Sequence, residues 1–165
     1  MSMVLVGRRL SADVVKSVTD NPAAVDALIY GDVEDDDAEM PEPELDLDKS
    51  WHGIHYALTG TAWQVGTGAG AAILGGDSVG DDNGYGPPRL ISAEQVQSIA
   101  ADLRRLDVES LRSRWDPAAL ADADIYPGFW ADITFDSYVL PYLAALREFY
   151  LAAAAENQAV LLALT

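Results

Sequence analysis

The chain has 165 residues, half of them hydrophobic, a composition typical of one globular domain with its own core. Its 27 acidic and 10 basic side chains give a formal net charge of −17, and such a field repels nucleic acid and anionic membrane surfaces, so we expect neither as a partner. The chain has no cysteine, which excludes disulfide bonds and thiolate metal sites.

The first thirty residues predict a strand followed by two short helices. The apolar run MVLV at residues 3–6 has the length of a strand, and we expect Gly7 to let the chain turn out of it. A four-residue run before the arginines is too short for a signal peptide or a membrane span, so we expect a cytoplasmic protein. Ser11 is a candidate N-cap of the first helix, and AAVDALIY at 23–30 predicts the second.

An acidic segment follows these helices. Residues 31–48 contain ten acidic side chains and no basic one, interleaved with Pro41 and Pro43. Because like charges repel and apolar residues are scarce there, we expect a flexible acidic loop at 31–45.

Residues 46–60, DLDKSWHGIHYALTG, predict a helix that carries both histidines of the chain. We expect Asp46 to be its N-cap and Gly60 to end it, with Gly53 allowing the close approach of a neighbour. An apolar stripe at helical spacing faces the core and consists of Leu47, Trp51, Ile54 and Leu58. A second stripe, turned by about 100°, is expected to border open space and consists of Asp48, His52, His55 and Thr59.

The second half of the chain predicts three capped helices, a long helix and a strand. The helix starts are a capping box of Ser92 with Gln95, Asp107, and Asp116 followed by Pro117. The long helix runs from about 135 to 156, with Pro141 tolerated near its first turn. The run AVLLAL at 159–164 predicts a strand that is buried on both faces and pairs with the first strand.

Several motifs spread along the chain resemble the YfbM-like proteins, a bacterial domain family of unknown function. They are RRLS at 8–11, LDLDKSWHGIHYALTG at 45–60, ILGG at 73–76, GYGPPRLIS at 84–92 and IYP at 125–127. The resemblance implies one α+β domain over residues 1–165, with several helices packed on a small sheet that includes the N- and C-terminal strands. It implies no established activity, substrate or site residue.

The histidine-bearing stripe is the first candidate site. Asp48, His52 and His55 present one carboxylate and two imidazoles, a set that could bind a ligand, supply a general base, or hold a metal ion through His52 and His55. The histidines are three residues apart, however, and not four as in the helical metalloprotease motif. The alternative is that His55 is hydrogen-bonded at the edge of the core and His52 is an exposed polar residue.

The segment DNGYGPPRLIS is the second candidate site. It combines Tyr85 between glycines with Arg89, a lone cation near an acidic tract. If this loop and the aromatic loop at 129–130 approach the histidines, with Tyr56 assisting, they form a ligand pocket. The alternative is that Arg89 pairs with an acid and the aromatic rings fill the core.

Two further motifs lack the context that their chemistry needs. GDSVG at 76–80 matches a nucleophile elbow around Ser78, but both histidines lie upstream of this serine. GTGAGAA at 66–72 has neither the spacing nor the downstream lysine of a phosphate-binding loop, so its glycines are more typical of tight turns and close packing. We expect no cofactor.

Two classes of function remain, and composition alone does not separate them. The charge of −17 and the lack of a complete catalytic set favour an interaction or regulatory module that binds a protein partner, one with a basic surface. The alternative is a small enzyme or a ligand- or metal-binding protein with its site around Asp48, His52 and His55. If the acidity reflects the composition of the organism's proteins, the charge says nothing about partners.

Overall fold

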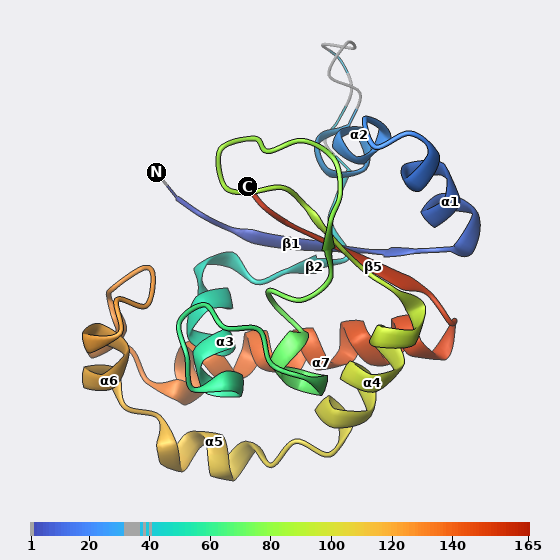
Figure 1. Ribbon diagram of the computed structural model, residues 1–165. Helices are drawn as coiled ribbons and strands as arrows, with labels where there is room; N and C mark the ends of the chain where they lie inside the picture. The colour runs from blue at the N-terminus through green and yellow to red at the C-terminus, as the bar shows by residue number, and fades with distance from the viewer. Residues whose placement is uncertain (1, 32–36, 38, 40) are drawn as a thin grey trace.

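The computed structural model describes residues 2–31, 37, 39 and 41–165, and in this part of the chain five strands form one antiparallel sheet. Their order across the sheet is β2-β1-β5-β4-β3. The strands are β1 (Leu5–Leu10), β2 (Leu45–Asp46), β3 (Asp77–Ser78), β4 (Arg89–Ile91) and β5 (Ala159–Leu164). Helices pack on both faces of this sheet, which confirms the expected α+β domain (Figure 1).

The first and last strands pair along their whole length, as the sequence predicted. The register runs from Leu5 opposite Leu164 to Leu10 opposite Ala159, and two backbone hydrogen bonds of 2.9 Å between Val4 and Thr165 extend it. β5 is buried from Ala159 to Ala163 because it lies inside the sheet with apolar layers on both faces. The prediction of a strand covered on both faces is therefore confirmed.

Gly7 does not turn the chain out of β1, so that prediction is wrong. The strand continues through Gly7 to Leu10. A Cβ atom at Gly7 would lie 3.0 Å from Leu162 Cδ2 and 3.1 Å from Phe149 Cζ. The glycine therefore serves close packing between the sheet and the helix beneath it.

One face of the sheet carries the two N-terminal helices, α1 (Ala12–Asp20) and α2 (Ala24–Tyr30), seen above the sheet in Figure 1. Ser11 is the N-cap of α1, as predicted, and its hydroxyl accepts a hydrogen bond from the Val14 N–H at 3.4 Å. A small apolar cluster joins these helices to the sheet through Leu10, Val18, Val25, Ile29, Ala159, Leu161 and Ala163.

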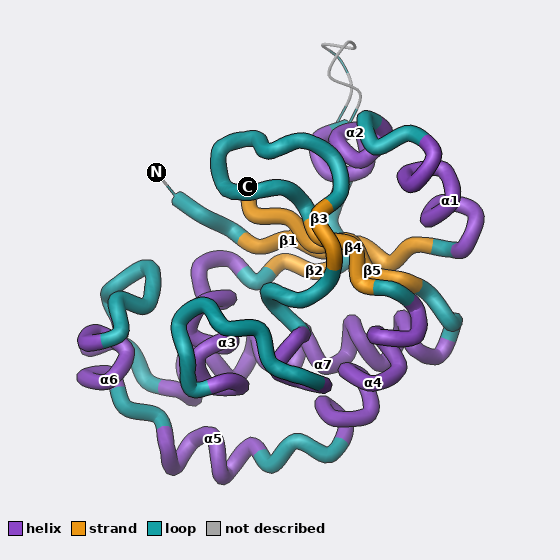
Figure 2. Tube along the Cα trace, in the orientation of Figure 1, coloured by secondary structure: helices purple, strands orange, loops and turns teal. Residues whose placement is uncertain are grey.

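The other face carries the main core and the remaining helices. They are α3 (Trp51–Thr59), α4 (Ala93–Arg104), α5 (Val108–Arg114), α6 (Pro117–Asp122) and α7 (Leu140–Ala155). Figure 2 shows these helices below the sheet, with the loop between β3 and β4 arching beside the C-terminal end of β5. This loop and the chain that follows α3 are the parts of the fold that shape the candidate site.

The helix starts in the second half follow the predicted local hydrogen bonds. Ser92 and Gln95 form the expected capping box of α4, and Asp107 and Asp116 accept hydrogen bonds from backbone N–H groups at the starts of α5 and α6. The long helix was predicted from about 135 with Pro141 near its first turn. A π-helical turn (Phe135–Val139) occupies the predicted start, and α7 follows with Pro141 in its first turn, as the sequence indicated.

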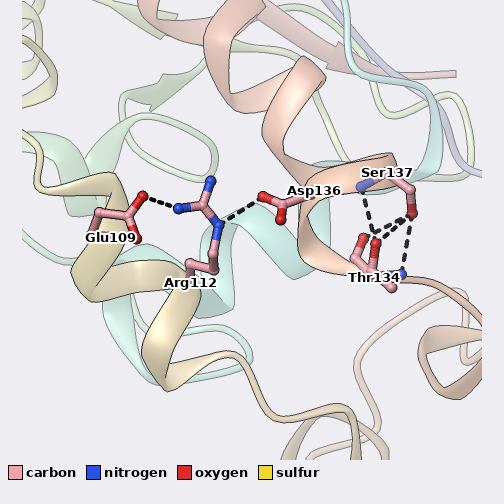
Figure 3. Close-up of polar contacts among 5 residues, drawn as sticks. All are labelled: Glu109, Arg112, Thr134, Asp136 and Ser137. Carbon is pink, nitrogen blue, oxygen red and sulfur yellow. Dashed lines mark hydrogen bonds and ion pairs between the residues drawn. The ribbon is translucent and has the colours of Figure 1, made fainter.

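Thr134 and Ser137 form a second capping box at this π-helical turn. Figure 3 shows it beside Arg112 of α5, which bridges Glu109 of its own helix and Asp136 of the turn. The Arg112 Nε–H donates to Asp136 Oδ1 at 2.7 Å, so these contacts join α5 to the start of α7. This ion pair is largely exposed and is expected to contribute little to stability.

The acidic segment predicted to be a loop at 31–45 lies in part outside the described residues. Its described end contacts β1, where Pro41 O accepts a hydrogen bond from Arg8 Nη2 at 2.7 Å and the Glu44 carboxylate accepts one from the Arg9 N–H. Leu45 then enters β2.

Candidate functional site

The helix that carries the histidines begins five residues after the predicted N-cap. Asp46 belongs to β2 and accepts a hydrogen bond from the Asp48 N–H at 2.7 Å, so it closes a turn and caps no helix. Residues Asp48–Ser50 form a 3-10 turn, and α3 starts at Trp51. Gly60 ends the helix in the left-handed conformation, as predicted.

Asp48 is turned away from the stripe that was predicted to join it to the histidines. Its φ angle is 45°, outside the helical range, and its carboxylate accepts a hydrogen bond of 3.0 Å from the Tyr138 hydroxyl. Burial and this hydrogen bond raise the pKa of Tyr138. Among the described residues no hydrogen bond joins Asp48 to an imidazole, so Asp48 is not placed to orient a histidine base.

His52 is fully buried with both ring nitrogens bound to backbone groups. Nδ1 accepts a hydrogen bond from the Tyr126 N–H at 3.0 Å, so Nε2 carries the proton and donates it to Ala62 O at 2.8 Å. Burial lowers the pKa of His52, and the hydrogen bond to Ala62 opposes this in part. The ring is therefore neutral and offers no lone pair to a metal ion.

His55 is buried as deeply as His52, but neither of its ring nitrogens has a hydrogen-bond partner among the described residues. Burial and, to a lesser extent, the nearby His52 lower its pKa to about 4, with the backbone of Gln64 opposing part of the change. A buried polar group without a partner reduces stability, so His55 is a costly residue in the core.

The prediction that the histidine flank borders open space is therefore wrong. The exposed fraction is 0% for His52 and 1% for His55. Within the described part of the chain, no group of three His, Cys, Asp or Glu side chains is arranged to hold a metal ion. The flank is buried because the chain after α3 folds back over it.

This returning segment, residues 61–65, places an aromatic ring at the surface. The ring of Trp63 lies 4.4 Å from that of His52, which in turn stacks on Trp51 at 4.8 Å with an interplanar angle of 12°. Trp63 is nevertheless 62% exposed, and Val65 of the same segment is 50% exposed. His52 thus supports the inner side of a tryptophan whose other side remains accessible.

Trp63 and Val65 line a surface hollow of about 200 Å³. The hollow lies where β5 extends beyond β4, between the segment after α3 and the loop that joins β3 to β4. Its remaining walls are Leu5, Ile73, Leu74, Tyr85, Gly86, Pro87, Arg89 and Leu162–Leu164. The structure therefore brings two predicted site residues, Tyr85 and Arg89, into one hollow with Trp63.

Arg89 is the cation of this hollow. It is half-buried at the start of β4, and its Nη1–H donates to Gly76 O at 3.3 Å. No carboxylate of the described residues forms an ion pair with it, unlike Arg9, Arg105 and Arg112. The alternative that Arg89 pairs locally with an acid is thus not met, and the Gly76 contact occupies one of its five N–H donors.

The other predicted aromatic residues lie elsewhere. Trp130 is 1% exposed, its Nε1–H donates to Ile125 O at 2.8 Å, and its ring occupies the space left by Gly53, where a Cβ atom would lie 2.4 Å from Trp130 Cη2. Tyr56 lines a separate hollow of about 160 Å³ with Arg114 and Trp115. Neither aromatic contributes to the hollow around Arg89.

The two discounted motifs have structural roles. Ser78 lies in the exposed two-residue strand β3, opposite Arg89 of β4, and not on a strand-to-helix turn. In the glycine-rich segment, the Ala69 N–H donates to Asp102 Oδ2 at 3.1 Å, and a Cβ atom at Gly68 would lie 1.6 Å from the same oxygen. These glycines permit close packing on α4, as the sequence indicated.

Trp63 and Val65 were missed in the sequence, although a signal for them was present. Both belong to TAWQVGTG, a segment of glycine, threonine and glutamine without helical or strand periodicity. Large apolar residues in such a segment have no predicted core face, and where they gather into one exposed patch they mark a binding surface.

Comparisons with known proteins give a family and a fold. The family model described as "Domain of unknown function (DUF1877)" matches residues 1–163. The crystal structure of YfbM from Escherichia coli, a protein of unknown function, is similar with a TM-score of 0.71 and 21% sequence identity, and the match covers 100% of each chain. No curated protein matches the chain. In the described part of the chain, no helix is both long and apolar enough to cross a membrane.

Proposed function

Because this chain belongs to the DUF1877 family, whose function is unknown, we propose a function from the geometry of the hollow: the protein binds a small ligand between Trp63 and Arg89. One observation carries the proposal. The large hydrophobic side chains that are exposed in the described residues, Trp63 and Val65, both line the hollow that contains the unpaired Arg89. Apolar walls with a few convergent polar groups are typical of ligand sites.

The size of the hollow supports a small organic ligand. An engineered protein cavity of about 150 Å³ binds benzene, so a hollow of about 200 Å³ has room for one ring with a substituent. Trp63 is held from behind by His52, and His52 is held by its two backbone hydrogen bonds. This support lowers the entropy that Trp63 would lose on binding, since its ring is already positioned.

Binding of three single-ring probes of different charge tests the proposal. Benzoate, benzamide and benzylamine are each titrated into the protein and followed by saturation-transfer NMR and by the indole N–H signal of Trp63, which a Trp63→Phe variant assigns. We expect at least one probe to bind and to shift this signal. In a Leu74→Trp variant, the larger ring fills the hollow and should abolish binding, because Leu74 is part of its wall.

Leu106→Trp is the matched control. Leu106 is also half-buried, but it lines a different hollow, beside α7. We expect this variant to bind the probe as the unmodified protein does. If no probe binds at millimolar concentration, or if Leu74→Trp binds as well as Leu106→Trp, the proposed function is wrong.

Binding of a basic protein partner is a second candidate function. One contact indicates where on the surface such a partner would bind. Asn83 Nδ2 donates to Asp26 Oδ1 at 3.2 Å and joins the loop between β3 and β4 to α2. This contact joins the loop that carries Asp81 and Asp82 to Asp26, the one acidic residue of α2, on a chain of net charge −17. Clustered charge of one sign accelerates association with an oppositely charged partner.

A pair of variants with equal charge tests this second candidate. Asp26→Asn with Asp81→Asn removes two negative charges from the face of α2, and Asp122→Asn with Glu156→Gln removes two from the opposite layer of helices. A lysine-rich peptide should bind the first variant more weakly than the second at low salt. Equal weakening in both would show that only the net charge matters. We place either function in the bacterial cytoplasm.

A further inference from the structure

The polar side chains in the wall of the hollow are mainly hydrogen-bond donors. The Arg89 guanidinium and the Trp63 indole can only donate hydrogen bonds, and the Tyr85 hydroxyl can donate or accept one. No acidic side chain is among the described residues that line the hollow. A ligand that satisfies these groups must therefore offer acceptors, and an anion also compensates the charge of Arg89.

From this arrangement, and resting on the proposed function, we infer that the ligand is an aromatic carboxylate with its carboxylate on Arg89 and its ring against Trp63. The guanidinium fork matches the two oxygens of a carboxylate, and its bond to Gly76 O uses only one of five donors. The exposed ring of Trp63 and the half-buried Tyr85 in the same wall favour a flat ring over an aliphatic chain of the same size.

The net negative charge of the protein favours a ligand with one negative charge over a ligand with two. Each negative charge on a ligand is repelled by the overall field of a chain with 27 acidic and 10 basic residues. A phosphate dianion experiences this repulsion twice, whereas only Arg89 in the hollow attracts it. A carboxylate has one charge and still fills the guanidinium fork, so it is the acceptor group that fits both the local and the overall charge.

The affinities of four single-ring probes test the inference. The affinities of benzoate, benzamide, phenyl phosphate and cyclohexanecarboxylate are measured by isothermal titration calorimetry on the full chain. We expect benzoate to bind at least tenfold more tightly than benzamide, which has the same shape without the charge. Phenyl phosphate should bind more weakly than benzoate because of its second charge, and cyclohexanecarboxylate more weakly because it lacks a planar ring.

Arg89→Gln identifies the residue that recognises the carboxylate. This variant should bind benzoate and benzamide with similar affinity, because the charge that distinguishes them has lost its partner, and Arg89→Lys should restore only part of the preference because lysine lacks the fork. Arg114→Gln is the matched control, since Arg114 is an arginine outside the hollow and should leave the preference unchanged. Thermal unfolding of each variant verifies that it is folded.

The outcomes separate this inference from the proposed function. If benzamide binds as tightly as benzoate, or if Arg89→Gln keeps the preference, the inference is overturned while ligand binding in the hollow stands. If cyclohexanecarboxylate matches benzoate, the aromatic part of the inference is wrong. If none of the probes binds, the proposed function fails and this inference fails with it.

Discussion

Replacing His55 with leucine should make the protein more resistant to acid. The imidazole is buried, has no hydrogen-bond partner among the described residues, and has a pKa lowered from its ordinary 6.5 to about 4. In the unfolded chain the same ring takes up a proton below about pH 6.5, whereas in the folded protein it stays neutral until about pH 4. Above about pH 6.5, His55 therefore does not reduce the free energy of unfolding. As the pH falls from 6.5 toward 4, it reduces this free energy progressively.

The size of this loss follows from the two pKa values. Each pH unit between them costs up to about 1.4 kcal/mol, so His55 should remove about 2 kcal/mol from the free energy of unfolding at pH 5. His55→Leu abolishes this contribution. Leucine also removes two unpartnered nitrogens from the core, and at pH 7.5 the variant should be at least as stable as the unmodified protein.

Urea unfolding followed by circular dichroism at pH 7.5 and pH 5.0 measures the effect. We expect the stability of His55→Leu relative to the unmodified protein to rise by about 2 kcal/mol between these values. His55→Gln is the control, since it cannot titrate but keeps a polar group in the core. Relative to the unmodified protein, it should gain as much stability on acidification as His55→Leu does. It should be less stable than His55→Leu at both pH values. A difference between His55→Leu and the unmodified protein that is equal at pH 7.5 and pH 5.0 would refute the reasoning.

Three further predictions concern the core and the helix starts. Gly53→Ala puts a Cβ atom 2.4 Å from Trp130 Cη2 and should cost about 1–3 kcal/mol in urea unfolding; Trp130→Phe should recover part of it, and an equal loss in both backgrounds would count against the contact. Tyr150→Phe removes the buried hydrogen bond of 2.7 Å to Ala72 O and should cost about 1–3 kcal/mol, so an unchanged urea midpoint would contradict the role of that bond. Ser92→Ala removes the cap of α4 and should lower stability by about 1 kcal/mol, whereas Ser92→Asp should retain most of it, and equal stability of the two variants would exclude capping as the cause.

Local sequence signals predicted the helix starts because their interactions span only a few residues. Ser92 and Gln95 form their capping box within one turn, and Asp116 accepts the hydrogen bond of Ala118 N–H two residues away. The pairing of the two terminal strands was also predicted, since each has an apolar run of strand length. The candidate site was predicted only in part: the sequence indicated Tyr85 and Arg89, but not Trp63.

The same local rules failed where distant segments compete with them. Helical periodicity placed Asp48 in line with the histidines, but the hydrogen bond from the Tyr138 hydroxyl, 90 residues away, accompanies a left-handed turn at Asp48. Gly7 had the signature of a turn, yet it lies inside β1, where a Cβ atom would be in tight contact with Leu162 and Phe149. In each case the partner lies far away in the chain.

The sequence by itself determined the α+β class, the helix starts and the overall negative charge, because periodicity, caps and composition are properties of short segments or of the whole chain. Tertiary structure alone decided which flank of α3 is buried and that Arg89, without an ion pair among the described residues, lines the hollow with Trp63. Burial depends on how the segment 61–65 folds back over His52 and His55, and the availability of Arg89 depends on where every carboxylate of the described chain comes to lie. These are relations between residues distant in sequence, and they form the hollow that we propose as the binding site.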